Sequence, residues 1–434
     1  MDILTFFRRC RAAAMAVAIA VTSAACAELT LAWTALEPKG EAAAPAIAPA
    51  ASRAEWEEAR APALRQLLQD NVYGRMPDAA RTELLDRRLV DAGAFEGRGR
   101  YEELRIRPTA IFGGVEARAP GGDLIMALIT PTAGDGPFPV IIMQTFCARQ
   151  SAAPHPEATQ PNGGPEMGGV LGAVATYVFG RYICTPPYED ILDAGYAVAV
   201  MSPGDIVPDR REEGVAALAA LSAQDPDDPT RWGAIAAWGW LYSRAVDALE
   251  DDARIHPSGY VVWGHSRYGK AALVAAAFDD RIDAVIAHQS GTGGASLNWD
   301  KKGESVGSIV GNYPHWFAPA YARLSEASDG EGARPAFDQH MLLALVAPRP
   351  MLLGNARRDV WSDPNGAFRA AQGAAPAYAA YGLTGLDQTD LSAFEPGADI
   401  AYWLRSGTHG VVEEDWPAFL SFLNAHFKTT PGAP

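Results

Sequence analysis

One short segment, residues 261–271, constrains the fold of this chain more than any other. Its apolar start, Val-Val-Trp, runs into Gly264-His265-Ser266, and a helix-forming stretch begins at Lys270. This order predicts a buried strand, a turn too tight for most side chains, and then a helix. A serine at such a turn projects its hydroxyl away from the sheet, next to the positive end of the helix dipole. The segment therefore predicts that Ser266 is a nucleophile, with an ordinary capped helix start as the alternative.

The rest of the chain predicts an α/β fold around that turn. Short continuous apolar runs alternate with helical stretches, which is typical of a buried parallel sheet with helices on both faces. Earlier segments alternate apolar and polar residues and predict antiparallel strands at one edge. We expect an α/β-hydrolase fold: a doubly wound, mostly parallel sheet with antiparallel N-terminal strands, in a three-layer sandwich. The expected parallel strands are Pro139–Gln144, Ala197–Met201, Tyr260–Gly264, Ala284–His288 and Pro350–Asn355, and the antiparallel ones are Leu84–Val90, Tyr101–Ile106 and Leu124–Leu128. A further strand is expected over Ile400–Leu404.

The first 27 residues have the pattern of a secretion signal. Three arginines, Arg8, Arg9 and Arg11, precede an apolar stretch, and Ala25-Cys26-Ala27 is a small-residue cleavage site. The apolar stretch is shorter than the about 20 residues that span a bilayer. We expect a signal peptide over residues 1–27 and a secreted or periplasmic protein. A lipid anchor at Cys26 is the alternative, although Ser23 stands where a lipobox has a large aliphatic residue.

A single folded domain is expected after this signal. Residues 28–52 are rich in Ala and Pro without a periodic pattern, and they predict a disordered tether. An amphipathic helix over residues 55–74 opens a catalytic domain predicted for residues 53–430. In an oxidising compartment Cys147 and Cys184 are free to form a disulfide, and two buried free thiols are the alternative.

Composition excludes several classes of partner. The formal net charge of −16 argues against nucleic acid and against an anionic membrane surface. The chain has no His-Glu-x-x-His motif, no paired Cys-x-x-Cys and no Gly-rich phosphate loop, so we expect neither a metal nor a cofactor. A monomer is the default expectation for the oligomeric state.

An active-site serine needs a base and an acid, which follow it in this fold class in the order Ser, Asp or Glu, His. His409 lies in the glycine-flanked loop after the last expected strand and is the predicted base. Asp359 follows the preceding strand and is the predicted acid. Asp363 competes for that role, but it precedes Pro364 and suits a turn. Two other histidines, His315 and His340, lie in apolar segments, where a structural role is expected.

Several motifs together resemble the glucuronoyl esterase family, particularly its bacterial members. The serine segment matches the family signature Gly-x-Ser-Arg-x-Gly-Lys, and the likeness extends over nearly all of the chain after the tether. Members of this family are secreted, cofactor-free α/β-hydrolases. The other matching motifs are Val72-Tyr-Gly-Arg, Gly204-Asp-Ile, Gln289-Ser-Gly-Thr-Gly-Gly-Ala, Tyr313-Pro-His-Trp-Phe, Phe337-Asp-Gln-His, Asp359-Val-Trp-Ser-Asp-Pro and Gly407-Thr-His-Gly.

The resemblance also implies roles for individual residues. Ser266 is the implied nucleophile and His409 the base, and the side chain and backbone of Arg267 would stabilise the oxyanion. Three further residues would bind the uronate: Lys270, Glu304 and Trp361. Lys and Glu offer directional hydrogen bonds to sugar hydroxyls, and Trp offers a packing surface. The structural alternatives are surface salt bridges for Lys270 and Glu304 and a core position for Trp361.

The chain departs from the family pattern at one position. Many members have a glutamate that serves as the acid after the strand following the nucleophile, and here that place is Gln289. An amide does not stabilise an imidazolium as a carboxylate does, so the acid role falls on Asp359. Some bacterial members have their acid at this later place.

The resemblance implies a serine esterase that cleaves the ester between 4-O-methylglucuronate groups of xylan and lignin alcohols. The expected partner is therefore a glucuronoxylan or lignin–carbohydrate ester. Three alternatives remain open: another carbohydrate or acetyl carboxylesterase, a carbohydrate-binding protein with a decayed or weakly active site, and a prolyl oligopeptidase-type peptidase. The chain lacks the propeller repeats that would precede a hydrolase domain of the last type.

Overall fold

The structure of this protein is a computed structural model that describes residues 46–159, 176, 178–222, 224–329, 331 and 333–428. The predicted signal peptide and residues 28–45 of the predicted tether lie outside these ranges. Of the remaining tether residues, Ile47 is buried and its N–H donates to Gly373 O at 3.0 Å. This end of the predicted tether therefore packs against the domain. Within the described part of the chain, no helix has the length and apolar character that a membrane crossing requires.

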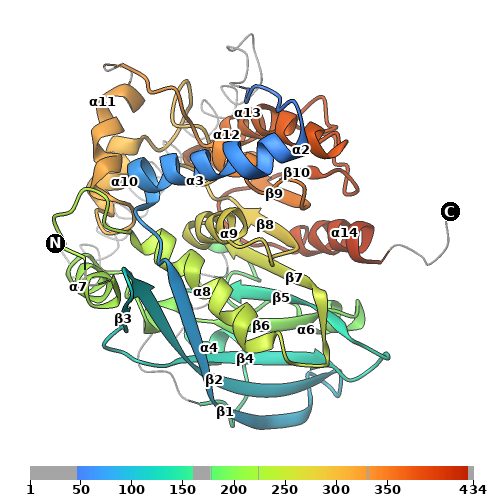
Figure 1. Cartoon of the computed structure of the whole chain (residues 1–434). Coiled ribbons are helices and arrows are strands. Elements are labelled where there is room, and N and C mark those ends of the chain that lie inside the picture. The colour runs from blue at the N-terminus through green and yellow to red at the C-terminus, as the bar shows by residue number, and fades with distance from the viewer. Residues whose placement is uncertain are drawn as a thin grey trace, which may run out of the picture.

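A mixed sheet forms the centre of the molecule (Figure 1). Its order is β1-β2-β4-β6-β5-β7-β8-β9-β10, and the short β3 pairs with β2. From β6 to β10 the strands pair in parallel, whereas β1, β2, β4 and β6 pair antiparallel. The strands are β1 (Ala79–Ala94), β2 (Gly99–Phe112), β3 (Val115–Ala117), β4 (Leu124–Pro131), β5 (Phe138–Gln144), β6 (Ala197–Met201), β7 (Ile255–His265), β8 (Ala284–His288), β9 (Met351–Ala356) and β10 (Ile400–Arg405).

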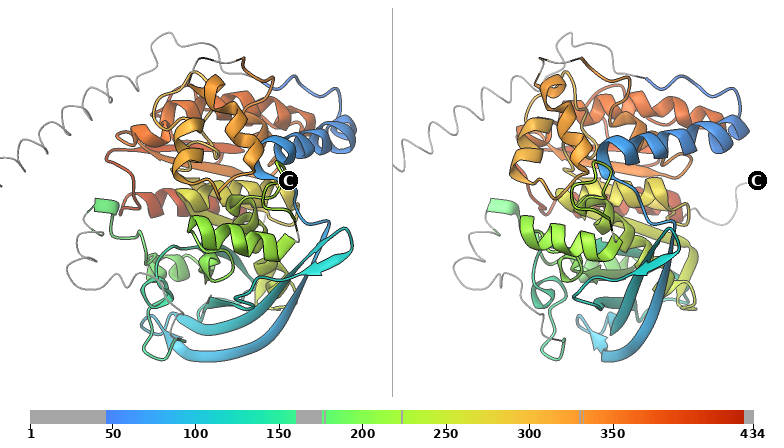
Figure 2. Two further views of the ribbon diagram at one scale, coloured as in Figure 1. Left: turned by 90° about the vertical axis from the view of Figure 1, so that its left-hand side faces the viewer. Right: turned by 60° about the vertical axis from the view of Figure 1, so that its left-hand side comes forward.

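Helices lie on both sides of this sheet (Figures 1 and 2). Residues 53–73 form one continuous helical stretch made of α2 (Arg53–Glu55), η1 (Trp56–Arg60), α3 (Ala61–Leu68) and η2 (Gln69–Tyr73). The other helices are α4 (Arg149–Ala152), α6 (Tyr188–Asp193), α7 (Arg211–Ser222), α8 (Ala234–Leu249), α9 (Arg267–Phe278), α10 (Val306–Asn312), α11 (Ser325–Ser328), α12 (His340–Ala344), α13 (Pro364–Ala374) and α14 (Asp415–Phe427). Short 3₁₀ turns are η3 (Pro203–Asp205), η4 (Pro319–Leu324), η5 (Val360–Ser362) and η6 (Ala375–Tyr381).

Two hydrophobic cores follow from the alternation of side chains along the strands. On β5, Val140 and Ile142 belong to the core under α8 and α9, whereas Ile141 belongs to the core under α6 and α14. Because both faces are covered, the central strands contain apolar residues at successive positions. The predicted α/β-hydrolase fold, with antiparallel N-terminal strands and a three-layer arrangement, is confirmed.

Candidate active site

Ser266 lies at a sharp turn between β7 and α9. Its backbone has φ 56° and ψ −121°, a conformation that L-residues rarely adopt, and its N–H donates to His288 O at 2.8 Å. The turn also needs a glycine two residues earlier, because a Cβ on Gly264 would lie 2.0 Å from Tyr268 O. The predicted strand, tight turn and helix are all present, and Ser266 is partly exposed at the corner.

The usual nucleophile turn of this fold class, Gly-x-Ser-x-Gly, has a second glycine two residues after the serine, which this chain lacks. Tyr268 occupies that place, and its side chain is buried against two aromatic rings. The Tyr268 ring centroid lies 5.3 Å from that of Trp238 and 6.2 Å from that of Phe146. A large residue is tolerated here because its side chain points into this aromatic cluster.

A histidine and a carboxylate from two later loops meet near this turn. His409 follows β10 and Asp359 follows β9, and His409 Nδ1 lies 2.7 Å from Asp359 Oδ2. Since Nδ1 is taken by the carboxylate, Nε2 is the ring nitrogen left for a reacting group. Ser362 Oγ is a second neighbour of His409 Nδ1, at 3.4 Å.

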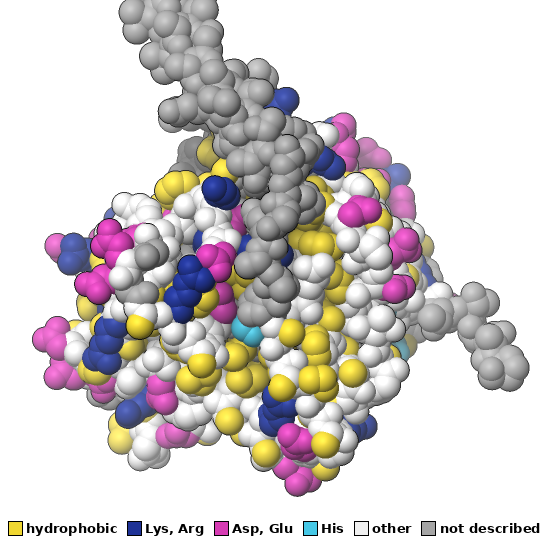
Figure 3. All heavy atoms as spheres, turned by 90° about the horizontal axis from the view of Figure 1, so that it is seen from above, with side chains coloured by type: hydrophobic (Ala, Val, Ile, Leu, Met, Phe, Trp, Pro, Cys, Tyr) yellow, Lys and Arg dark blue, Asp and Glu magenta, His cyan; other side chains and the backbone are white. Residues whose placement is uncertain are grey.

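The same imidazole lies beside the serine turn. Its ring centroid is 4.6 Å from that of His265, the residue immediately before Ser266. About a third of the His409 side chain is exposed, whereas Asp359 is buried. Figure 3 shows a histidine at the surface of one face of the molecule, with charged side chains gathered to its left and hydrophobic side chains to its right and below.

The competing carboxylate, Asp363, has a different task. It caps α13 by accepting the Gly366 N–H at 3.1 Å, and it lies 3.3 Å from Lys302 N and 3.4 Å from Ser296 Oγ. This is the turn role that Pro364 suggests. The structure therefore brings Asp359, rather than Asp363, to His409.

Arg267 is the first residue of α9, so its N–H has no acceptor in the preceding turn of that helix. Its guanidinium forms an ion pair with Asp209. The Arg267 Cζ atom also lies 5.1 Å from the ring centroid of Trp316 and 5.8 Å from that of Phe146. The same carboxylate accepts bonds from His315 Nε2 at 2.9 Å and Trp316 Nε1 at 2.7 Å.

Lys270 lies one helical turn after Ser266 and is buried. Its ammonium donates to the main-chain oxygens of Ser290 and Thr292, the latter at 2.8 Å. Burial lowers the pKa of Lys270 to about 8, and the nearby Glu304 carboxylate opposes that shift in part. The position is interior, which differs from the surface salt bridge of the structural alternative.

Glu304 and Trp361 form the next part of this cluster. Glu304 is buried, its N–H donates to Trp361 O at 3.0 Å, and Trp361 is 56% exposed. The two segments approach closely because Gly303, with φ 76°, lacks a Cβ that would lie 2.1 Å from Val360 O. An exposed indole next to a buried carboxylate differs from the core position of the structural alternative.

Burial and neighbouring charges shift the pKa values of the groups in this cluster. Burial raises the pKa of Glu304, although Lys270 and Lys301 partly offset the rise. For Asp359, burial also favours the neutral form, but the charge and hydrogen bond of His409 outweigh it and the pKa is lowered. Burial lowers the pKa of Lys301, whose Nζ donates to Glu304 O at 2.7 Å.

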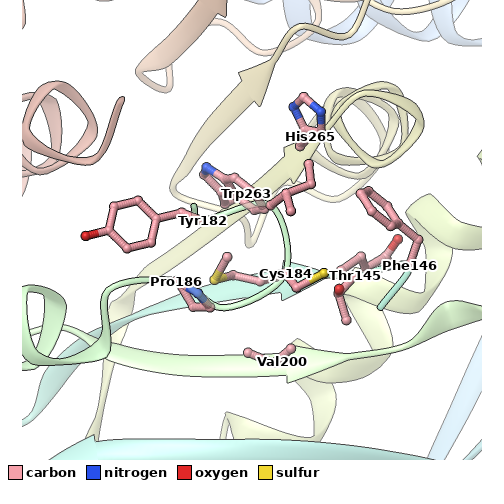
Figure 4. Close-up of a pocket in the computed structure, with 11 residues that line it drawn as sticks. Thr145, Phe146, Tyr182, Cys184, Pro186, Val200, Trp263 and His265 are labelled. Atoms are coloured by element: carbon pink, nitrogen blue, oxygen red, sulfur yellow. The ribbon is translucent and has the colours of Figure 1, made fainter. Parts of the chain in front are cut away.

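The predicted disulfide between Cys147 and Cys184 is present. It joins the loop after β5 to the segment before α6. A small pocket next to it is lined by residues of both segments and of β7, and in Figure 4 Thr145, Phe146, Cys184, Trp263 and His265 surround it. Because Phe146 also contacts Tyr268 and Arg267, the disulfide holds a loop that borders the serine turn.

Three further histidines, His265, His315 and His340, are buried. Burial, together with the neighbouring rings of His409 and His288, lowers the pKa of His265 well below its usual value. Burial lowers the pKa of His315 to about 4 and that of His340 to about 4. In the described ranges, no group of three or more His, Cys, Asp or Glu side chains could hold a metal ion.

The predictions made from the sequence did not include three residues of this site. Asp209 pairs with Arg267, Lys301 borders Glu304, and Ser362 contacts His409. Lys301 and Ser362 could have been proposed from the sequence, because they are polar residues close in the chain to the predicted residues Glu304 and Asp359. Asp209 carried no signal, because only the tertiary structure brings its loop to the serine turn.

Comparisons with known proteins identify the family. The model for fungal glucuronyl esterases matches residues 227–382. Carbohydrate esterase MZ0003, from an unknown prokaryotic organism, is 33% identical over 385 residues, 86% of either chain. The 4-O-methyl-glucuronoyl methylesterase of Hypocrea jecorina is 34% identical over 163 residues, which cover 35% of this chain and 34% of that protein.

Solved structures agree with this assignment. A promiscuous CE15 esterase from a marine bacterial metagenome has 29% identity and a TM-score of 0.74, with coverage of 90% of this chain and 98% of the other. A glucuronoyl esterase from Solibacter usitatus has 28% identity and a TM-score of 0.73 at the same coverage. With a serine turn, a histidine–carboxylate pair and a relative of this similarity over most of its length, the chain belongs to the CE15 glucuronoyl esterase family of carbohydrate esterases.

Proposed function

We propose that this protein is a serine esterase that hydrolyses esters of glucuronic or 4-O-methylglucuronic acid. One observation carries the proposal above the others: the 2.7 Å contact between Asp359 and His409, beside the turn that presents Ser266, in a member of this family. The carboxylate would hold the imidazole in the tautomer that accepts a proton on Nε2.

Acyl transfer follows from these roles. His409 takes the proton of Ser266 while Oγ attacks the uronate carbonyl carbon, and the protonated imidazole then gives that proton to the leaving alcohol. Water next attacks the acyl-enzyme with His409 again as base, which releases the uronate and restores Ser266. Asp359 stays ionised throughout, in keeping with its lowered pKa.

The oxyanion of each tetrahedral intermediate needs hydrogen-bond donors. Arg267 is our candidate, because its N–H opens α9 and its guanidinium is fixed by Asp209 and Trp316 beside the serine turn. Removing one oxyanion donor typically costs about 10²- to 10³-fold in kcat.

Recognition of the sugar would use the cluster next to the nucleophile. The Lys270 ammonium donates two of its three N–H groups to main-chain oxygens, which leaves one to donate to a uronate hydroxyl. Glu304 offers acceptor oxygens, and the exposed indole of Trp361 offers a flat apolar face.

The natural substrate we propose is the ester between glucuronoxylan side groups and lignin alcohols. The name of the Hypocrea jecorina relative supports the uronate part. We propose that the signal at residues 1–27 exports the protein, which the disulfide supports. Less selective hydrolysis of other carboxylic esters is the second candidate, favoured by the promiscuity of the marine metagenome relative.

The test compares benzyl glucuronate with p-nitrophenyl acetate. We expect a kcat/KM for the glucuronate at least ten times that for the acetate, and loss of both activities in Ser266→Ala. A preference for the acetate would favour the second candidate. Unchanged activity in Ser266→Ala would refute the serine mechanism altogether.

A further inference from the structure

Gln289 occupies the place where many family members have their acid, and its main chain is held from two sides. It follows β8 directly and has φ 50°, in the left-handed region. Its main-chain N–H donates to Gly354 O at 2.7 Å, and its main-chain oxygen accepts a hydrogen bond from Ser362 Oγ at 3.4 Å. Gly354 is in β9, and Ser362 is the residue that contacts His409. The backbone of Gln289 is therefore fixed relative to the acid loop.

The Gln289 side chain bonds the main chain on both sides of His409. Its Oε1 accepts the Gly410 N–H at 2.7 Å, and its Nε2 donates to Thr408 O at 3.3 Å. The residue is 1% exposed, so neither bond competes with bulk water. We infer that Gln289 is a positioning residue, whose carboxamide fixes the backbone of His409 and so directs its ring toward Ser266. This inference rests on the proposed function of the Ser266–His409 pair.

The chemistry of the two contacts selects an amide. One contact requires an acceptor and the other a donor, and a carboxamide supplies both. An ionised carboxylate can only accept hydrogen bonds. It would keep the bond from the Gly410 N–H, but its second oxygen would face Thr408 O, and two acceptors repel each other. The Gln289 amide therefore matches the hydrogen-bonding groups around it, and its role differs from that of the glutamate it replaces. Its presence does not mark a decayed site.

Other residues keep the same loop folded. Arg405 Nη2 donates to Thr408 O at 3.1 Å and to Gly410 O at 2.8 Å, and Arg405 is paired with the buried Asp415. His288 Nε2 lies 3.0 Å from Gly410 O. Loss of the Gln289 amide should therefore loosen the placement of His409 without unfolding the loop. The effect is expected in kcat more than in KM.

The experiment uses Gln289→Met, which keeps the side-chain volume without either bond, and Gln289→Glu. The control is Gln388→Met, because Gln388 is also buried and its Oε1 accepts the Tyr402 N–H at 2.7 Å. For each full-length variant we would measure kcat and KM on both esters, the thermal midpoint, and the rate of Ser266 inactivation by an organophosphonate. The last readout needs an activated serine but no sugar.

We expect both Gln289 variants to lose about 10- to 100-fold in kcat and in inactivation rate, with KM within twofold, since small misplacements of a catalytic group cost this much. Gln388→Met should lower the thermal midpoint and keep kcat. Gln289→Glu should also fail to restore activity to Asp359→Asn.

Three results would overturn the inference: kcat and inactivation rate within twofold of the wild type in Gln289→Met, losses that Gln388→Met reproduces at an equal fall in thermal midpoint, or rescue of Asp359→Asn by Gln289→Glu. If the wild type cleaves neither ester, the proposed substrate fails. The inactivation rates then still decide the role of Gln289.

Discussion

Asp359 and Glu304 are both buried carboxylates near His409, yet their environments shift their pKa values in opposite directions. Burial favours the neutral form of each, with exposures of 3% and 6%. Asp359 overcomes this through the charge and hydrogen bond of His409, so its pKa is lowered. Glu304 has only partial compensation from Lys270 and Lys301, so its pKa is raised. Two acids whose pKa values are shifted in opposite directions by their environments are expected to have separate tasks.

These opposite pKa shifts indicate which of the two carboxylates must carry charge. An acid that stabilises an imidazolium has to be ionised during turnover, and Asp359 is held in that state. A residue that only orients sugar hydroxyls works as a hydrogen-bond partner in either state. Of the four predictions below, the first and the last test this division, and the other two test the charge of Lys270 beside Glu304.

The largest effect is expected for Asp359→Asn. The amide preserves shape but not charge, so the imidazolium loses its partner and the imidazole its preferred tautomer. We expect kcat to fall by about 10³- to 10⁴-fold with little change in KM. The matched control is Asp363→Asn, which should keep kcat, because an Asn side-chain oxygen can still accept the Gly366 N–H that caps α13. Equal kcat losses in the two variants would remove the distinction between them.

An intermediate effect is expected from the titration of Lys270. Because burial lowers its pKa to about 8, the ammonium loses its charge as pH rises through that value. KM for benzyl glucuronate should then rise about tenfold between pH 7 and 9, with kcat less affected, as a hydrogen bond to a charged group weakens. Lys270→Met should have a high KM at every pH and no such step. A step that persists in this variant belongs to another group.

The same shift predicts a stability difference with a definite sign. The folded protein holds the Lys270 proton less tightly than the unfolded chain, whose lysine has a pKa of 10.5. Between pH 8 and 10.5 the unfolded state therefore binds more protons, and this contribution to the free energy of unfolding rises with pH. Denaturant unfolding of the wild type and Lys270→Met over that range measures the contribution as a difference between the two proteins.

The smallest effect is expected for Glu304→Gln. Because an amide of the same shape keeps an acceptor oxygen for a sugar hydroxyl, this substitution should change KM by less than about fivefold and leave kcat unchanged. Steady-state kinetics beside Asp359→Asn provides the comparison. A loss in kcat as large as that of Asp359→Asn would mean that Glu304 shares the charge of the triad.

Local patterns were enough to predict the strands, the serine turn and the loop of His409. Apolar runs predict buried strands wherever both faces of the sheet are covered, and a glycine before Ser266 is required by the close approach of Tyr268 O. These features depend on residues close together in the chain. The resemblance to the family added the candidates Lys270, Glu304 and Trp361, whose roles remain proposals.

The amino-acid sequence was enough to establish the order of the elements and the chemical groups available at their ends. Which of these groups meet depends on the folded chain: Asp359 rather than Asp363 with His409, Asp209 with Arg267, and the Gln289 amide with the backbone around His409. Distance is the reason. A hydrogen bond is made or lost within about half an ångström, and that placement depends on how loops from β8, β9 and β10 pack against one another.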